Sequence, residues 1–163
     1  MSAGLIAVAR WVHFVGFAVA FGASVAALFA HRSARKEAAP DKSGLEVAAA
    51  SAITSVELPG LFLALFAGIA LIAAFPAALD PKSSGAGPWL HIKLAFVLAL
   101  LGASHVRMFR ARRLTRERKA GASEAECEQL ASAARTLGAV DVCLFVVIIA
   151  LATMRFVLFG GAA

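Results

Sequence analysis

The most informative part of this sequence is the stretch PWLHIKLAFVLALLGASH, which runs from Pro88 to His105. Most of it is apolar, yet His91 and Lys93 lie near one end and His105 lies at the other. With the residues that follow it to about position 109, it is long enough to cross a bilayer, where a helix satisfies its own backbone polar groups. The stretch therefore predicts a membrane-spanning helix that carries two histidines and a lysine.

Three more apolar blocks accompany this one, and polar or helix-breaking residues separate them. The expected spans cover about residues 5–30, 52–79, 88–109 and 137–159. Of the 163 residues, 61% are hydrophobic, whereas a soluble domain is usually about 45–50% apolar. The sequence thus predicts a single transmembrane domain over residues 1–163. Its expected fold class is all-α, an integral membrane four-helix bundle.

The cations are concentrated between the spans and indicate how the helices are oriented. The segments 31–51 and 106–136 are rich in Lys and Arg, whereas 80–87 contains only Lys82. The positive-inside rule predicts that 31–51 and 106–136 are cytoplasmic loops and that both termini are periplasmic. We therefore expect a multi-pass protein of the bacterial inner (cytoplasmic) membrane. This topology accounts for the net charge of +6, and without a recognition motif nucleic acid is not an expected partner.

Ionisable residues inside the spans are costly and are therefore candidates for function. The expected orientation divides them into two layers. The outer layer contains Arg10, His13, His91, Lys93 and Arg155, and the inner layer contains Glu57, His105 and Asp141, with His31 at the membrane edge. The inner residues Glu57, His105 and Asp141 form a candidate proton or substrate site. Alternatively, the two acids are structural partners of nearby arginines, and the arginines of 106–136 are topology signals.

Helical periodicity indicates which of these side chains share a helix face. At about 100° per residue, His91 and His105 lie about 40° apart on one face and about 21 Å apart along the axis. His13 and His31 are five full turns apart, so they also share a face. His91 and Lys93 lie roughly 200° apart. Only one of these two side chains can therefore face the interior of the bundle.

Histidines on facing helices of a four-helix bundle are a common means of holding haem. The first span supplies His13 as a ligand, and Arg10 and Arg155 lie at the right depth to pair with the haem propionates. Glycines in the first three spans leave room for the ring, or they serve only to let helices pack closely. A lone membrane histidine can also simply hydrogen-bond to a neighbouring helix.

The quoted stretch also carries a resemblance to a known family. Trp89, Lys93 and His105 have the spacing found in the HemJ-type protoporphyrinogen oxidases and the related CopD-like membrane proteins, which this sequence resembles. The resemblance covers most of the chain. The other matching residues are His13 in the first span, Pro59 and Gly68 in the second, and Asp141 and Arg155 in the fourth.

This resemblance implies haem b as the cofactor, with His13 and Lys93 at the site and His91 as a further candidate ligand. It also implies the oxidation of protoporphyrinogen IX, a porphyrin substrate, with electrons passing through haem to a membrane acceptor such as quinone. The Asn-Glu-x-Pro motif with which the family enters its fourth span is replaced here by GAVDV, Gly138 to Val142.

Two other functions stay open. One is a non-enzymatic haem b electron-transfer or accessory subunit, in which His13 with His91, and His31 with His105, hold two haems. The other is copper uptake or handling, because histidine and methionine bind copper, although the methionines of the last two spans are expected near opposite sides. The expected partners are the lipid bilayer and either a second copy of the chain, as a homo-oligomer, or a larger membrane complex.

Overall fold

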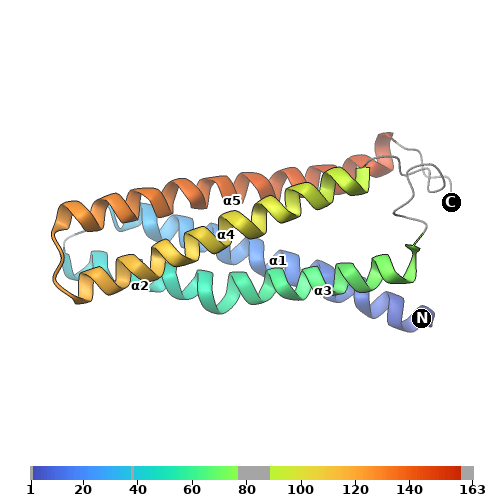
Figure 1. Ribbon diagram of the computed structural model, residues 1–163, viewed down its shortest axis with the longest axis horizontal. Coiled ribbons are helices and arrows are strands. Elements are labelled where there is room, and N and C mark those ends of the chain that lie inside the picture. The colour runs from blue at the N-terminus through green and yellow to red at the C-terminus, as the bar shows by residue number, and fades with distance from the viewer. Residues whose placement is uncertain (1, 38, 77–88, 159–163) are drawn as a thin grey trace.

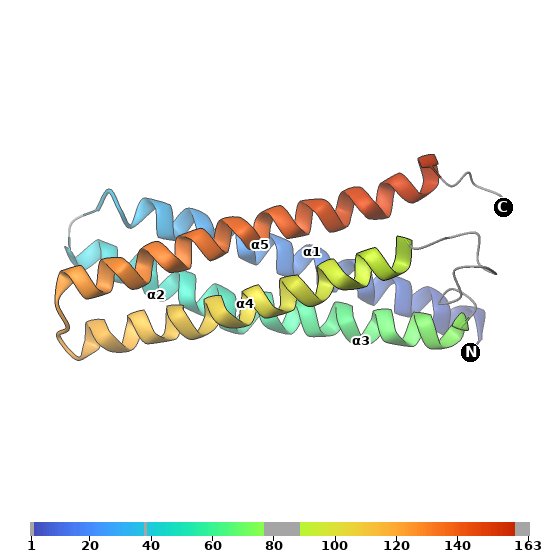
Figure 2. The same cartoon turned by 45° about the horizontal axis from the view of Figure 1, so that its top comes forward.

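The computed structural model of the chain describes residues 2–37, 39–76 and 89–158, and at 39–41 and 155–158 it describes the backbone alone. The helices are α1 (Ala3–Ser33), α2 (Ala39–Ala52), the π-helix η1 (Ile53–Glu57), α3 (Leu58–Ala74), α4 (Trp89–Lys119) and α5 (Glu124–Leu158). These described residues contain no strand. Because α2, η1 and α3 follow one another without a break, the helices form four rods that lie side by side (Figures 1 and 2).

Each of the four rods contains a segment that is long and apolar enough to cross a membrane. Large apolar side chains are exposed around the bundle, among them Trp11, Phe14 and Leu98, each at least 68% exposed. Such a surface is unfavourable in water but suits a lipid environment. The prediction of an all-α, multi-pass membrane bundle of four helices is therefore confirmed.

The helices extend beyond the expected spans at one end of the bundle. α4 continues to Lys119 and α5 begins at Glu124, so most of the segment 106–136 is helical and not an open loop. The turn between them contains Gly121, whose φ is +75°, a conformation that glycine adopts without strain. Ser123 and Glu126 then begin α5 with reciprocal side-chain-to-backbone hydrogen bonds of 3.3 and 3.2 Å, the pattern of a capping box.

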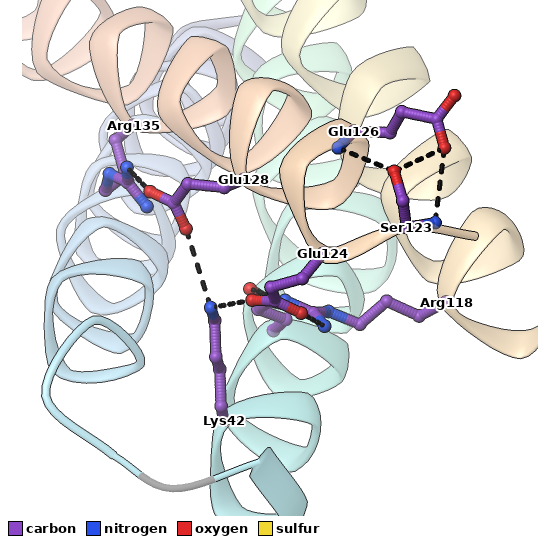
Figure 3. A network of polar contacts seen from close by, with 8 residues as sticks. Lys42, Arg118, Ser123, Glu124, Glu126, Glu128 and Arg135 are labelled. Carbon is purple, nitrogen blue, oxygen red and sulfur yellow. Dashed lines mark hydrogen bonds and ion pairs between the residues drawn. The ribbon is translucent and has the colours of Figure 1, made fainter. Parts of the chain in front are cut away.

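Ion pairs connect the helices at this end, which we call the polar end (the helix segments around Lys42, Glu46, Arg118, Glu124 and Glu128). Lys42 of α2 contacts Glu124 and Glu128 of α5 (Figure 3). Arg118 of α4 contacts Glu46 of α2 and Glu124 of α5. These contacts link α2 to the hairpin that α4 and α5 form.

α1 and α3 cross at two glycines. A Cβ on Gly16 would lie 2.8 Å from the Ala64 nitrogen and 2.8 Å from the Gly60 oxygen, and a Cβ on Gly60 would lie 2.9 Å from the Gly16 oxygen. Neither position has room for a side chain, so the two helices pack backbone against backbone. Of the two roles expected for the glycines, close packing is the role of this pair. Gly22 and Gly102 differ, because a Cβ there would meet no atom within 4 Å.

Aromatic side chains fill the middle of the bundle. Phe145 of α5 is fully buried, and its ring centroid lies 5.0 Å from that of Phe17 and 5.5 Å from that of Phe21 on α1. Leu100 of α4 is buried in the same cluster. These four residues form what we call the phenylalanine layer. It lies between two groups of polar side chains, one toward the beginning of α1 and one toward the polar end.

Candidate functional site

An apolar pocket of about 560 Å³ lies between α1, α3 and α4, on the side of the phenylalanine layer away from the polar end. Aliphatic side chains of α3 and α4 make up most of its wall. Three basic side chains also line it, Arg10 and His13 from α1 and Lys93 from α4. The sequence assigned all three to the outer layer, and the structure brings them to one pocket.

The backbone of α3 fixes His13 within this pocket. Its Nδ1 lies 2.7 Å from the Ala64 carbonyl oxygen. Because a carbonyl oxygen can only accept, Nδ1 donates and Nε2 retains its lone pair. Gly68 leaves room for the ring, since a Cβ there would lie 3.3 Å from Cε1 and Nδ1 of His13. A hydrogen bond to a neighbouring helix is the simple alternative given above for a membrane histidine. Proteins also commonly use such a bond to orient a metal-binding histidine.

On α4, Lys93 lines the pocket and His91 does not. The Lys93 ammonium lies 5.4 Å from the centroid of the Trp89 ring, and Trp89 Nε1 donates to the Leu151 carbonyl oxygen at 2.5 Å. His91 is exposed, in agreement with the expected angle between the two side chains. The side chain of Arg155 lies outside the described residues, because α5 is described there by its backbone alone.

A second polar group lies on the other side of the phenylalanine layer, around the fully buried Arg107 of α4. Its Nη1 donates to Ser24 Oγ at 2.8 Å, and to Glu57 Oε2 and Asp141 Oδ2 at 3.2 Å each. Its Nη2 donates to the Ser24 carbonyl oxygen at 3.3 Å. These four residues and Ser104 have no exposed surface. We call these five residues the buried charge cluster, and they connect all four rods.

The structure corrects one interpretation made from the sequence. The arginine-rich segment 106–136 indicates a topology signal, but this is wrong for Arg107, whose side chain is buried against two carboxylates. Glu57 and Asp141 do come together, as partners of an arginine. His105 is not among them: its Nδ1 donates at 2.9 Å to a carbonyl oxygen one turn earlier, and its ring packs edge-on against Phe62.

The sequence interpretation missed Arg107, Ser24 and Ser104 as members of a site. Arg107 follows Lys93 by 14 residues, so at about 100° per residue the two lie about 40° apart on α4. That spacing is a signal that could have placed Arg107 inside the bundle. Ser24 and Ser104 carry no such signal, because small residues are common wherever membrane helices pack closely.

Two local features position the charged groups of the cluster. η1 ends at Glu57, and the N–H that follows it bonds to the Ile53 carbonyl oxygen, five residues earlier. Pro59, which has no N–H to continue the α-helical pattern, lies just after this π-turn. On α5, Gly138 makes room for the guanidinium, because a Cβ there would lie 3.1 Å from Cζ and Nη2 of Arg107.

The other candidate metal ligands do not converge. Met108 is buried in the core and Met154 is exposed near the end of α5. Within 2–37, 39–76 and 89–158, no three His, Cys, Asp or Glu side chains lie close enough to hold a metal ion. No family model, curated protein or solved structure matches the chain. The function is therefore argued from the residues of the two polar groups.

Proposed function

We propose that this chain is a membrane redox protein that binds haem b in the pocket lined by Arg10, His13 and Lys93. The hydrogen bond from His13 Nδ1 to the Ala64 carbonyl carries this proposal, because it leaves the Nε2 lone pair of a pocket-lining imidazole available. A neutral histidine oriented in this way is a usual axial ligand of haem iron.

The remainder of the pocket suits a flat and largely apolar ring. Its volume of about 560 Å³ falls within the roughly 300–1,000 Å³ of cofactor and small-molecule sites. The aliphatic wall would keep water from the ring. Lys93 is the candidate second iron ligand, and Arg10 is the candidate partner of a propionate. His91 and His105 do not line the pocket, so the proposed site does not include them.

Bound haem would supply one-electron chemistry that the side chains of the chain lack. The residues of the chain would bind and orient it, exclude water and balance the propionate charge. We propose protoporphyrinogen IX as the substrate and a quinone as the electron acceptor, supported by the spacing of Trp89, Lys93 and His105. The proposed location is a bacterial inner membrane, with the cationic polar end in the cytoplasm.

The visible absorption spectrum of the purified protein, produced in haem-replete cells, tests haem binding. We expect sharp α and Soret bands after reduction. His13→Ala should lose these bands, whereas His105→Ala should retain them because His105 lies outside the pocket. A colourless native protein, or bands that persist in His13→Ala, would overturn the proposal.

Complementation separates the enzyme from a non-enzymatic electron-transfer subunit. A strain that lacks protoporphyrinogen oxidase should grow when it expresses this chain, and should fail to grow with His13→Ala. If the strain does not grow although the purified chain carries haem, the oxidase activity is wrong and electron transfer is favoured.

A further inference from the structure

The buried charge cluster has no role in the proposed haem site, and its charges do not balance. Arg107 provides the one cation hydrogen-bonded within it, while Glu57 and Asp141 are two acids. With both acids ionised, this trio would have a net charge of −1 in a place where every side chain is 0% exposed. An uncompensated charge in such surroundings is strongly unfavourable, so a carboxyl group there takes up a proton instead.

The polar atoms of the cluster that have no hydrogen-bond partner indicate where a proton would be held. One oxygen of each acid, Glu57 Oε1 and Asp141 Oδ1, is buried without a hydrogen-bond partner. The buried Ser104 hydroxyl also has no partner, although it lies beside both carboxyl groups. A carboxylic acid O–H needs an acceptor, and a hydroxyl oxygen can both accept and donate.

His31 lies between the cluster and the polar end. It follows Ser24 by seven residues, which places it on the same face of α1 and about 10 Å further along the axis. Its ring is buried, and neither nitrogen has a hydrogen-bond partner. A charged imidazole is unfavourable where the ring is buried without a hydrogen-bond partner, and the nearby charged groups are the cations of Arg107 and Arg135, so we take His31 as neutral and not as a charge that balances the cluster. A neutral imidazole can accept a proton on one nitrogen and release one from the other.

We propose that Glu57, Asp141 and Arg107 form a membrane-embedded site that binds one exchangeable proton, and that His31 connects this site to the polar end. A proton from water at the polar end converts one carboxylate into a carboxylic acid, and the charge of the trio changes from −1 to zero. Release of the proton reverses the change. Because either acid can carry the proton, the site holds it as a pair.

Infrared spectroscopy of the full chain in lipid vesicles at pH 7 tests the site. The native protein should show the C=O stretch of a buried carboxylic acid, shifted to lower frequency in D₂O. Glu57→Gln and Asp141→Asn should each abolish this band, because the remaining carboxylate then balances Arg107. Glu117→Gln, on the exposed side of α4 with Arg113, should leave it unchanged. Absence of the band in the native protein, or its persistence in either cluster variant, would overturn the proposal.

The rate at which the same band shifts in D₂O tests the connection through His31. His31→Leu should retain the band and slow its exchange at least tenfold. His105→Leu, the matched control on α4, should exchange at the native rate. An unchanged rate in His31→Leu would exclude His31 as the connection. Neither measurement depends on haem, so failure of the haem proposal and failure of this one are distinguishable.

Discussion

Arg107 and Arg113 show how burial changes what an ion pair contributes to stability. Arg113 lies 3.4 Å from Glu117 and its side chain is 69% exposed, whereas Arg107 lies 3.2 Å from each of two acids and is 0% exposed. The lengths are similar, but water can replace the partner of Arg113. Nothing replaces the guanidinium of Arg107, so its loss leaves both acids of the cluster without a cation.

Arg107→Met should therefore destabilise the protein by about 3–5 kcal/mol, the usual cost of breaking a buried ion pair. Arg113→Met should lower the free energy of unfolding by at most about 1 kcal/mol, because an exposed ion pair contributes no more than that. Thermal unfolding in detergent measures both. Adding Glu57→Gln and Asp141→Asn to Arg107→Met should recover part of the loss. Equal stabilities of the two methionine variants would contradict this account.

Gly138 lies against the same guanidinium, so a substitution there also tests the packing of Arg107. Gly138→Ala places a methyl group 3.1 Å from the Arg107 guanidinium. We expect this overpacking to lower the free energy of unfolding by about 1–3 kcal/mol. The control is Gly102→Ala, where a Cβ meets nothing within 4 Å, so the higher helix propensity of alanine should leave stability unchanged or raised. The same unfolding measurement compares them, and a tolerated Gly138→Ala would show that Arg107 can move away.

Single residues also show what the sequence could and could not predict. Helical phase limited the pocket to one of His91 and Lys93, because both lie on one regular helix. The partners of His13 could not be predicted, because the Ala64 carbonyl comes from another helix and every residue has a carbonyl. Arg107 was misassigned because charge alone does not distinguish a solvated arginine from one paired across the bundle.

The crossing of α1 and α3 determines where His13 lies. Gly16 contacts the backbone of Gly60 and Ala64, and the carbonyl of Ala64 also accepts the hydrogen bond from His13. The packing contact and the orientation of the imidazole thus depend on the same turn of α3.

Gly16→Ala should separate the two helices, because its methyl group would lie 2.8 Å from backbone atoms that no side-chain rotation can move. We expect a lower unfolding temperature together with loss of the His13–Ala64 hydrogen bond, which NMR of labelled histidine would detect. Gly22→Ala, on the same helix with no atom within 4 Å, should change neither. Normal histidine signals in Gly16→Ala would contradict this link.

The ion pairs that attach α2 to the α4–α5 hairpin should respond to acid. Hydrogen bonds from Arg118 and Lys42 lower the pKa of Glu124 from 4.5 to about 2. A lowered folded-state pKa means that the stabilisation is complete above about pH 4.5 and is lost as the pH falls toward 2. Glu124 is exposed, so the effect is small and local.

Hydrogen exchange of residues 42–52, corrected for the intrinsic rate at each pH, measures this attachment. Exchange should accelerate between pH 4.5 and 2 in the native protein. Glu124→Gln should exchange faster already at pH 7 and respond less to acid. A native exchange rate in Glu124→Gln at pH 7 would show that Glu124 does not hold α2.

The sequence predicted the elements better than their ends. Long apolar blocks identify four spans because each needs enough residues to cross a bilayer. The segment 106–136 is expected between the last two spans, whereas α4 continues to Lys119 and α5 begins at Glu124. The π-turn before Pro59 could not be predicted, because a proline near the start of a helix is equally compatible with an ordinary α-helical turn.

In the bundle as a whole, α1 begins and α5 ends at the same end, opposite the polar end (Figure 1). Because each span crosses the bundle once, four spans return the chain to the end at which it began. We predict that the polar end is cytoplasmic, because cations next to spans are retained on that side. A phosphatase fused to the C-terminus should be active in the periplasm, and the same reporter inserted at Gly121 should be inactive. The reverse pattern of reporter activity would show that the polar end is periplasmic and would contradict the prediction.

The phenylalanine layer has a consequence for charges on its two sides. From His13 to Ser24 the chain rises 11 residues, or about 17 Å, and the layer provides no polar group along the way. At an effective dielectric constant of about 20, unit charges this far apart interact by roughly 1 kcal/mol. An electron added to the proposed haem would thus raise the proton affinity of the buried charge cluster about fivefold. The phenylalanine layer therefore separates the two polar groups by apolar side chains, while the electric field of a charge on one side still reaches the other.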